Sequence, residues 1–279
     1  MTHQVSLTTG KNGSQTIVFG GGGRFPVIAG PCVVESRDVL ETVAEELLRI
    51  MEVLPVSFIF KSSYRKANRT SGSTFTGIGD ENALRLLDEI RAQYHLPVLT
   101  DIHLPEEARL AAEVADVLQI PAFLARQSDL LISAAETGKV INIKKGQFMS
   151  PNDMRFAKEK VVAAGNDRVL LTERGTFFGY GDLVVDFRSL DVMREFGSPI
   201  IYDATHSVQR PSQDGISGGE RRFIKPLALA AAAVGIDGIF IETHPDPSKA
   251  LSDKSTQLPL AELEALLRSI LSVREASKV

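Results

Sequence analysis

Six basic side chains in this sequence have the chemistry needed to hold anionic small molecules. They are Lys61, Lys66, Arg69, Arg126, Lys144 and Arg174. Arginine binds phosphate or carboxylate through paired hydrogen bonds, and lysine binds these groups as a compact point charge. The alternative is that the cations pair internally with Asp101, Glu173 and Asp203, which would neutralise the site. Because the cations outnumber these carboxylates, the sequence favours a pocket for anionic substrates.

A second set of side chains could bind a metal ion. Cys32, His206, Glu242 and Asp253 offer one thiolate, one imidazole and two carboxylates. Mixed sulfur, nitrogen and oxygen ligands suit zinc, iron(II), manganese or cobalt better than magnesium or calcium. The set has none of the local spacings, such as CxxC or HExxH, that mark metal sites, and a lone cysteine is usually a small buried residue. The residues alone therefore leave both interpretations open.

Lys144 permits a different chemistry. A lysine whose pKa is lowered by burial can form a Schiff base with a carbonyl substrate, as in a class I aldolase. Its neighbours Lys145 and Arg174 fit phosphate or carboxylate binding equally well. Position along the chain does not decide between the covalent and the electrostatic role.

These residues follow short apolar segments that have the composition of buried strands. The predicted strands are rich in Val, Ile and Leu, and they read FPVIAGP, VSFIFKS, PVLTDIH, DVLQIPA, KVINIKKG, VLLTERG, PIIYDATH and GIFIETH. Such runs are typical of parallel strands that are covered on both faces. The polar residues gather at the C-terminal ends of these strands, where a closed α/β barrel carries its functional groups.

Helical patterns alternate with the predicted strands. The clearest cover residues 37–53, 81–94, 106–114, 129–137, 152–164, 183–196, 223–234 and 260–276. A short N-terminal hairpin is predicted from VSLTTG and QTIVFG, with a turn at Asn12-Gly13. Since no long Pro/Gly/Ser-rich linker divides the chain, the pattern predicts a single (β/α)8 TIM barrel domain over residues 1–279, with the hairpin closing the barrel floor.

Composition limits the class of protein further. The 279 residues are 43% hydrophobic and 24% charged, as in ordinary globular proteins, and the formal net charge is -4. This charge argues against a general binder of nucleic acid or of a membrane surface. One cysteine, no long apolar run and no signal-peptide pattern lead us to expect a cytoplasmic protein without an internal disulfide.

The strand-end sequences are similar to those of a known enzyme family along nearly the whole chain. The matching segments are IAGPCVVES, FKSSYRKANRTS, LTDIH, LQIPAFLARQSDLL, NIKKGQF, TERGTFFGYGDLVVDFRSL, THSVQRP and FIETHPDP. They resemble the 3-deoxy-D-manno-octulosonate 8-phosphate synthases, which belong to the phosphoenolpyruvate-condensing aldolases. The segment KANRTS discriminates best, because related enzymes acting on erythrose 4-phosphate have KPRTS there, and Asn68 favours the arabinose 5-phosphate enzymes.

The resemblance implies a reaction. Phosphoenolpyruvate would condense with D-arabinose 5-phosphate, releasing inorganic phosphate and the eight-carbon sugar acid phosphate that is used for lipopolysaccharide. In this family water adds at C2 of phosphoenolpyruvate while C3 attacks the aldehyde, so Lys144 need not become covalent. Holding two anions together costs repulsion that the cations offset, and alignment makes the condensation effectively unimolecular.

The resemblance also implies roles for individual residues. The expected catalytic residues are Lys66, Asn68, Asp101, Lys144, Arg174 and His206. The expected substrate-binding residues are Lys61, Lys66, Asn68, Arg69, Thr70, Gln119, Arg126, Lys144 and Arg174. Lys66, Lys144 and Arg174 match the phosphoenolpyruvate clamp. Residues 68–70 match the arabinose phosphate loop, and Asp101 would lie between the substrates. Arg126 matches a residue that reaches the sugar phosphate across a subunit boundary, which implies a homotetramer.

The same resemblance favours a metal-dependent enzyme. The family divides into members with cysteine after the first strand and members with asparagine there, and this chain has Cys32. His206, Glu242 and Asp253 stand at the other matching ligand positions. A divalent ion would then orient a water molecule or the aldehyde rather than perform redox chemistry.

Several segments depart from the family pattern. The last loop reads SDKSTQLPL where many members have SDGPN, which leaves Asp253 less secure as a ligand than the other three residues. YRKANRTS replaces the commoner FDKANRSS, so that Arg65 stands for an acidic residue and Thr70 for serine. Gly181-Asp182 replaces Asn-Asn, and we assign no effect to this change.

Two other functions fit parts of the pattern. A related synthase using erythrose 4-phosphate would keep the same clamp, and a silent barrel could bind phosphorylated metabolites as a sensor. The remaining histidines do not decide between them. We expect His103 and His244 to support other residues or the fold, whereas His3 and His95 have no assigned role.

Overall fold

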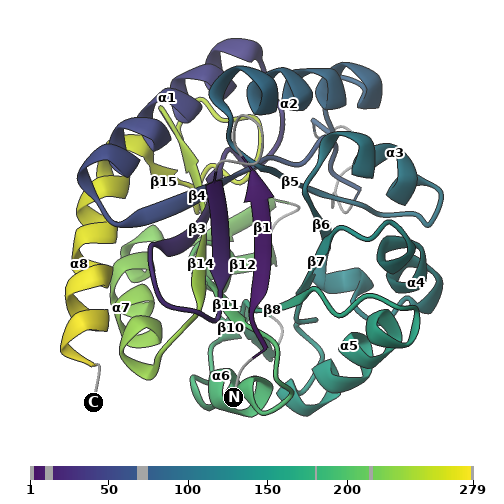
Figure 1. Ribbon diagram of the computed structural model, residues 1–279. Coiled ribbons are helices and arrows are strands. Elements are labelled where there is room, and N and C mark those ends of the chain that lie inside the picture. Colours follow the sequence, from purple (N-terminus) through teal and green to yellow (C-terminus); the bar gives the residue numbers. More distant parts are fainter. Residues whose placement is uncertain (1–2, 10–14, 68–74, 180, 214–215, 278–279) are drawn as a thin grey trace.

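Eight parallel strands form a closed barrel at the centre of the molecule. The computed structural model describes residues 3–9, 15–67, 75–179, 181–213 and 216–277 (Figure 1). The barrel strands are β3 (Phe25–Gly30), β4 (Val56–Lys61), β5 (Val98–Asp101), β6 (Val117–Ile120), β7 (Val140–Lys144), β8 (Val169–Glu173), β11 (Ile200–Asp203) and β14 (Gly238–His244). Each pairs with the next along the chain, and β14 pairs with both β11 and β3, which closes the ring. The predicted (β/α)8 barrel is therefore confirmed.

A ring of helices surrounds the barrel (Figure 1). The helices are α1 (Arg37–Val53), α2 (Asp80–Tyr94), α3 (Glu107–Val114), α4 (Ser128–Glu136), α5 (Met154–Ala163), α6 (Arg188–Arg194), α7 (Ile224–Val234) and α8 (Leu263–Ala276). Most ends agree with the sequence prediction to within two residues. The start of α1 has a clear local cause, because the Ser36 side chain accepts the Val39 N–H at 3.4 Å and caps the helix.

One predicted helix is much shorter than expected. The helical pattern over 183–196 yields only α6, because residues 182–184 form the strand β10 (Asp182–Val184), which pairs with β9 (Thr176–Phe178). The run Leu183-Val184-Val185 has branched side chains that suit a strand. Asp186 then accepts the Arg188 N–H at 3.0 Å, which favours helix formation only from this point onward.

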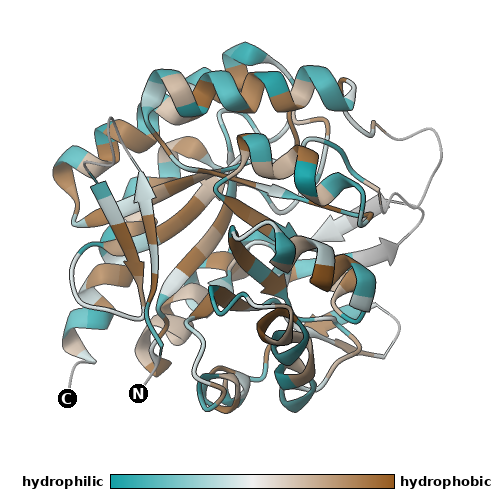
Figure 2. Cartoon of the chain, turned by 45° about the vertical axis from the view of Figure 1, so that its right-hand side comes forward, coloured by the Kyte–Doolittle hydropathy of each residue, from teal (hydrophilic) through white to brown (hydrophobic). Residues whose placement is uncertain are grey.

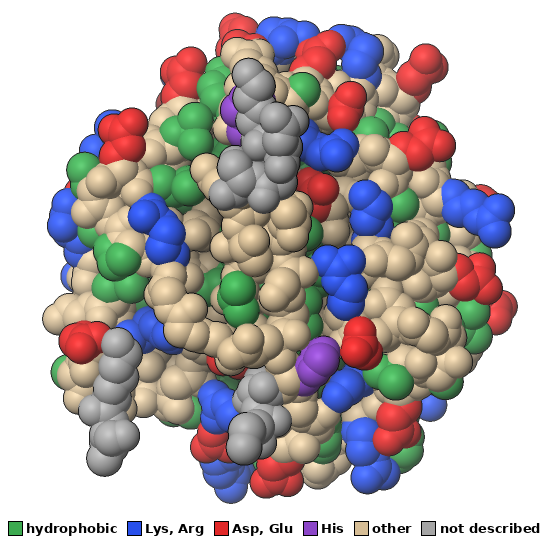
Figure 3. Space-filling view, viewed as in Figure 1, with side chains coloured by type: hydrophobic (Ala, Val, Ile, Leu, Met, Phe, Trp, Pro, Cys, Tyr) green, Lys and Arg blue, Asp and Glu red, His purple; other side chains and the backbone are tan. Residues whose placement is uncertain are grey.

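The N-terminal hairpin covers one end of the barrel. It consists of β1 (Val5–Thr9) and β2 (Gln15–Phe19), paired antiparallel with Val5 opposite Phe19. Its predicted turn at Asn12-Gly13 lies outside the described residues. Buried side chains of the hairpin join an apolar cluster inside the barrel that comprises Val5, Leu7, Ile17, Phe19, Ile28, Ile59, Leu99, Val117, Val140, Leu170, Ile201 and Phe240. Figure 3 shows this face, with charged side chains mostly around its edge.

A larger apolar core fills the space between the strands and the helices. It includes Leu40, Val43 and Leu47 of α1 and Leu263, Leu267 and Ile270 of α8, all fully buried. Figure 2 shows the hydrophobic residues along the central strands and the mixed hydropathy of the surrounding helices. This amphipathic pattern explains why the helices lie on the barrel with one face toward solvent.

The loops at the opposite end of the barrel carry further short elements. These are β9, β10, β12 (Gln209–Gln213), β13 (Ile216–Gly219) and β15 (Leu258–Pro259), with short 3-10 helices at Ala122–Leu124, Pro151–Asp153, His206–Val208, Arg221–Phe223 and Leu260–Glu262. The elaborated loops therefore lie at the C-terminal ends of the strands. Within the described part of the chain, no helix combines the length and apolarity that crossing a membrane requires.

Candidate active site and metal centre

The C-terminal ends of the barrel strands bring an unusual number of charged side chains into the interior. Parallel strands of a closed barrel all end at one face, so residues far apart in sequence meet there. The buried charged residues at this face are Lys61, Asp101, Lys144, Lys145, Glu173, Arg174, Asp203 and Glu242. Buried charges are costly unless they are paired or bind an ion or ligand, so this end is the candidate site.

Several of these charges form internal ion pairs. Lys61 Nζ contacts Glu242 Oε1, and Lys144 Nζ contacts Asp203 Oδ2. Lys66 Nζ lies 3.9 Å from carboxylate oxygens of both Asp101 and Glu242. The internal pairing considered from the sequence is therefore present. It compensates the buried charges, and each ammonium group has three donors to distribute between carboxylate and ligand.

The ion pairs set the protonation states of the carboxylates. Burial alone raises the pKa of Asp203, but His206 and Lys144 outweigh it and hold that pKa well below its usual range. Burial likewise raises the pKa of Glu242, but His206 and Lys61 outweigh burial and hold that pKa well below its usual range. Both carboxylates are therefore ionised at neutral pH, and Glu242 can donate electron pairs to a cation.

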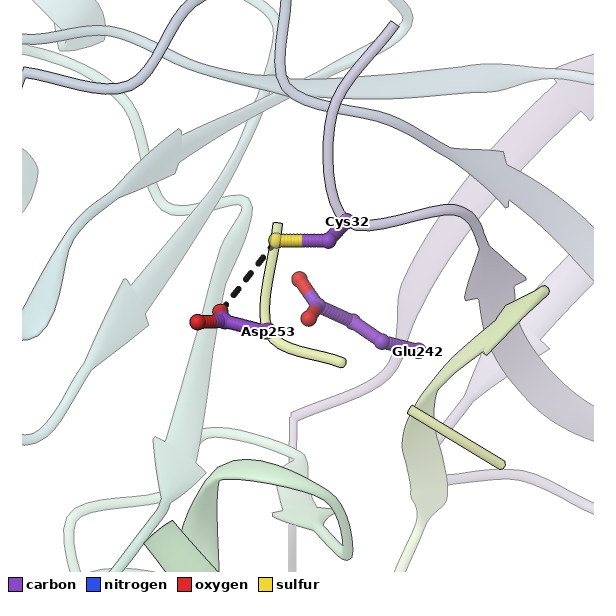
Figure 4. Close-up of side chains that lie close together, drawn as sticks. All are labelled: Cys32, Glu242 and Asp253. Carbon is purple, nitrogen blue, oxygen red and sulfur yellow. Dashed lines mark hydrogen bonds between the residues drawn. The ribbon is translucent and has the colours of Figure 1, made fainter. Parts of the chain in front are cut away.

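Three potential metal ligands converge on one point beside this cluster. Cys32 follows β3, Glu242 lies in β14, and Asp253 lies in the loop after β14. The Cys32 sulfur and one carboxylate oxygen of each acid all lie within 4.8 Å of one another. Figure 4 shows the three side chains pointing toward one another, with the Cys32 thiol donating to Asp253 Oδ2 at 3.2 Å.

The donor set fits a borderline divalent metal. Cys32 is fully buried, and burial followed by the charges of Asp253 and Glu242 raises the pKa of its thiol. Glu242 Oε2 is buried and has no hydrogen-bond partner among the described residues. A cation at this point would satisfy that oxygen and favour the thiolate, and a sulfur and carboxylate set suits zinc or a neighbouring transition metal. These three residues could therefore hold a metal ion.

His206, the fourth predicted ligand, lies next to this group. It is not among the residues whose ligand atoms all lie within 4.8 Å of one another. Its Nδ1 is 2.8 Å from Asp203 Oδ2, and its Nε2 is 3.5 Å from Glu242 Oε1. Nδ1 also lies 3.4 Å from Lys144 Nζ, so its role as donor or acceptor depends on the tautomer. The tautomer with the proton on Nδ1 donates to Asp203, at the shorter distance, and presents the Nε2 lone pair on the Glu242 side. This is the orientation that a metal-binding histidine uses.

The expected anion-binding residues surround the same space. Arg174 is buried, and its Nη2 donates to Gln209 Oε1 at 2.8 Å. Its Nη1 is buried without a hydrogen-bond partner in the described part of the chain. Lys144 Nζ lies 3.5 Å from the centre of the Phe240 ring as well as against Asp203. An incoming anion would satisfy Arg174. Burial lowers the pKa of Lys144 and outweighs the opposing charges of Asp203 and Glu242, which is the direction that the Schiff-base alternative requires. The contact with Asp203 Oδ2 opposes this shift, because it stabilises the ammonium form.

A buried polar network fixes Gln119 and Asp101. Gln119 Nε2 donates to Asp101 Oδ1, and its Oε1 accepts from Asn142 Nδ2 at 2.9 Å. Asn142 Oδ1 in turn accepts from Thr172 at 2.6 Å. Asn142 and Thr172 were missed by the sequence analysis. The signal for Asn142 was its position two residues before Lys144, which places both side chains on one face of β7.

Two further residues missed from the sequence support Cys32. Gln257 Oε1 accepts the Cys32 backbone N–H at 3.2 Å, and Gln257 Nε2 donates to the Ser252 carbonyl at 2.9 Å. Ser252 Oγ lies 2.9 Å from the Cys32 sulfur. Both residues belong to SDKSTQLPL, the segment that departs from the family pattern. The altered loop therefore contacts the cysteine directly and still brings Asp253 beside it.

The remaining predicted substrate-binding residues differ in their positions. Lys61 is fully buried and donates to the Cys32 carbonyl at 2.9 Å as well as to Glu242, so its contacts are to the potential metal ligands. Arg126 has an exposed side chain in the loop after β6. Asn68, Arg69 and Thr70 lie outside the described residues.

The other residues singled out from the sequence lie around or away from the site. Asp182 lies in β10 and accepts from Arg210 Nε at 3.0 Å. The buried His244 accepts the Asp246 N–H at 3.0 Å through Nδ1, and His103 donates its backbone N–H to Glu107 at 2.7 Å. His3 lies 3.5 Å from Asp167, and His95 ends α2 with a positive φ of 55°.

Comparison with known proteins gives a consistent assignment. Residues 4–278 match the model of the DAHP synthetase I family. A protein of Trichlorobacter lovleyi is 54% identical over 91% of this chain and 94% of its own length. One of Syntrophotalea carbinolica is 52% identical over 92% and 93%, and one of Synechococcus sp. is 51% identical over 98% and 96%. All three are named 2-dehydro-3-deoxyphosphooctonate aldolase. The chain therefore belongs to the DAHP synthetase I family, and within it to the group of proteins named 2-dehydro-3-deoxyphosphooctonate aldolase.

Proposed function

We propose that this protein condenses phosphoenolpyruvate with D-arabinose 5-phosphate and water, giving 3-deoxy-D-manno-octulosonate 8-phosphate and inorganic phosphate for lipopolysaccharide synthesis. It is a transferase that forms a carbon–carbon bond. The observation that carries the proposal is the joint position of buried cations and potential metal ligands at one end of the barrel. Lys66 Nζ lies 3.9 Å from Glu242 Oε1, which links the two sets directly.

The cations would hold phosphoenolpyruvate. Arg174 has a buried Nη1 without a hydrogen-bond partner among the described residues, which suits a phosphate or carboxylate oxygen. Lys144 and Lys66 add positive charge beside Asp203, Asp101 and Glu242. Gln119 holds Asp101 in place through the hydrogen bond to Oδ1. Fixed donors of this kind lower the barrier because they are already oriented when charge develops on the substrate.

The reaction needs one new carbon–carbon bond and the departure of phosphate. C3 of phosphoenolpyruvate attacks the aldehyde carbon of the sugar, a water oxygen adds at C2, and the phosphate leaves C2 with its bridging oxygen. The aldehyde oxygen gains one proton, which balances one of the two protons lost by the water, and the departing phosphate takes up the other. We assign proton movement here to Asp101, with Asn68 and Lys66 positioning the aldehyde, while His206 would act on the reaction through the metal that it holds.

A divalent metal would be held by Cys32, His206, Glu242 and Asp253. When bound, it would supply Lewis acidity that orients the attacking water or the aldehyde. We propose zinc, iron(II), manganese or cobalt, because this mixture of sulfur, nitrogen and oxygen donors suits those ions. Gln257 would hold the Cys32 backbone and Ser252 would contact the Cys32 sulfur.

The second substrate and the oligomeric state are linked in this proposal. Asn68, Arg69 and Thr70 would bind the sugar phosphate, and Arg126 of a neighbouring subunit would reach the same phosphate. Exposed aromatic side chains support a subunit contact at this face, since Phe123, Phe148 and Phe178 are exposed to 47%, 52% and 75%. We therefore propose a homotetramer of chains that each act as a single domain, located in the cytoplasm, where the Cys32 thiol stays reduced.

Competing aldehydes test the proposal directly. Purified protein supplied with phosphoenolpyruvate and one of the added divalent metals is assayed for phosphate release with arabinose 5-phosphate and, separately, with erythrose 4-phosphate. We expect arabinose 5-phosphate to be preferred by at least about a hundredfold in kcat/KM, as is usual where a site hydrogen-bonds a substrate hydroxyl. Equal rates, or preference for erythrose 4-phosphate, would assign the related synthase instead. Binding of phosphoenolpyruvate without turnover of either aldehyde would indicate a sensor.

A further inference from the structure

Arg65 joins three elements next to the candidate site. Its Nη1 donates to Asp80 Oδ2 at 2.8 Å at the start of α2, and its Nη2 donates to Glu107 Oε1 at the start of α3. Its guanidinium carbon lies 5.7 Å from the centre of the Tyr64 ring. The Arg65 side chain is only 30% exposed. It is therefore partly enclosed by the partners it joins rather than extended into solvent.

Glu107 collects several donors at this point. Besides Arg65, its carboxylate accepts the Tyr64 hydroxyl through Oε2, and that oxygen also accepts the His103 backbone N–H at 2.7 Å. Its side chain is 12% exposed. The mostly buried Glu107 carboxylate thus connects the segment after β4 to the segment after β5. Charge-assisted hydrogen bonds of this kind are the strong ones in proteins.

The residue after Arg65 is one of the cations of the site. The Lys66 backbone N–H donates to the Thr76 carbonyl at 2.8 Å, and Lys66 Nζ donates to Ser63 Oγ at 2.9 Å. Gly77 lies close by, and a Cβ there would come within 3.0 Å of the Tyr64 carbonyl oxygen. The backbone of residues 64–66 is therefore held on both sides, and Arg65 provides its link to the outer helices.

We infer that Arg65 is a positioning residue that holds Lys66 in place for phosphoenolpyruvate by fastening residues 64–66 to Asp80 and Glu107. The inference rests on the proposed function. The charge of Arg65 matches its two partners, Asp80 and Glu107, and a carboxylate at position 65 would repel both. Arg65 therefore acts through Lys66 rather than by touching substrate.

The test compares Arg65→Ala and Arg65→Lys with the control Arg85→Ala. Arg85 pairs with Glu89 on the solvent side of α2 at 2.6 Å and has a 56% exposed side chain. For each protein, steady-state kinetics with added metal give KM for phosphoenolpyruvate and kcat, and calorimetry gives the dissociation constant of phosphoenolpyruvate. For Arg65→Ala we expect about a tenfold rise in both KM and the dissociation constant, with kcat changed less than about threefold. Arg65→Lys should recover part of the loss, and Arg85→Ala should behave as wild type.

A purely structural role would lower the melting temperature and the active fraction while leaving KM for phosphoenolpyruvate unchanged, and that result would overturn the inference. If Arg65→Ala does not fold, the double variant Asp80→Asn with Glu107→Gln keeps Arg65 but neutralises its partners. It should show the same rise in KM, and an unchanged KM would again overturn the inference. Failure of wild type itself to bind phosphoenolpyruvate would instead count against the proposed function, so the two outcomes are distinguishable.

Discussion

The two ends of the barrel interior are built on opposite principles. At the floor, the hairpin residues Val5 and Phe19 pack with strand residues into a wholly apolar cluster. At the other end, lysines, carboxylates and one arginine are buried together. Phe240 lies at the boundary, since it belongs to the apolar cluster while Lys144 Nζ and Lys61 Nζ lie 3.5 Å and 5.5 Å from its ring centre.

The difference separates stability from function. Burial of apolar surface at the floor stabilises the fold. The buried charges at the other end must offset large desolvation costs and contribute little net stability even when paired. Changes at the floor should therefore lower the free energy of unfolding without altering substrate affinity. Changes at the charged end should lower substrate affinity, with or without an effect on the free energy of unfolding.

The largest effect on activity is expected for Lys144→Gln. The change removes a cation from the substrate clamp and leaves the fully buried Asp203 with one partner fewer. We expect kcat/KM to fall by about a thousandfold, which corresponds to about 4 kcal/mol. Phosphate-release kinetics measure it, with Lys225→Gln, a change at an exposed residue of α7, as the control. A loss below about tenfold would mean that Lys144 does not bind the substrate.

A somewhat smaller effect is expected for Cys32→Ala. The variant loses the thiolate of the potential metal site but keeps Glu242 and Asp253, so metal affinity rather than folding should suffer. We expect about a hundredfold loss of activity at limiting metal together with a loss of bound metal after dialysis. Metal content is measured by elemental analysis. Full metal retention in the variant would remove Cys32 from the ligand set.

The floor should show the opposite behaviour in Phe19→Leu. Phe19 is fully buried, and the smaller side chain leaves part of its space unfilled. We expect the free energy of unfolding to fall by about 1 to 1.5 kcal/mol, measured by urea denaturation. Both KM values and kcat should stay at the wild-type level. A raised KM would show that the floor and the charged end are coupled.

The smallest effect concerns the pH dependence of Glu107. Burial raises the pKa of Glu107, but hydrogen bonds from His103 and Tyr64 outweigh it and lower that pKa to about 2. The pKa of Glu107 is lower in the folded protein than its usual value of 4.5. The ionised Glu107 carboxylate therefore stabilises the fold fully above pH 4.5, and this contribution is lost as the pH falls toward about 2. Glu107→Gln should be less stable than wild type by about 1 kcal/mol at pH 7.

The difference between Glu107→Gln and wild type should shrink as the pH falls below 4.5. Urea midpoints at several pH values measure this difference for the two proteins side by side. A difference in stability between the two proteins that stays constant from pH 7 to pH 3 would show that the contribution of Glu107 to stability does not depend on its charge.

The barrel and much of the charged end could be predicted from the sequence. Strand composition and the helical period fix which segments alternate, and closure then places Cys32, Glu242 and Asp253 at one face. The helix predicted over 183–196 was wrong in its first part, because strand pairing between β9 and β10 prevailed over the local helical pattern. Such pairing depends on a partner segment that a short sequence window does not include.

The supporting side chains were harder to predict. Asn142 and Thr172 resemble ordinary strand residues in the sequence. Their role depends on the strand register, which brings Asn142 beside Gln119, and on the hydrogen bond from Thr172 to Asn142. Gln257 reaches the Cys32 backbone across 225 positions of sequence. Arg65 was recognised only as a departure from the family, whereas its partners Asp80 and Glu107 become apparent once α2 and α3 are placed.

The most direct test of the central claim uses chelator-stripped protein. Phosphate release from phosphoenolpyruvate with arabinose 5-phosphate is measured before and after adding back manganese, zinc, iron(II) or cobalt. We predict that activity is lost on stripping and returns with at least one of these metals, and that Cys32→Ala at the same limiting metal concentration recovers only about a hundredth of the wild-type activity. Full activity in the stripped wild-type protein would contradict the metal centre, and no activity with any metal would contradict the proposed reaction.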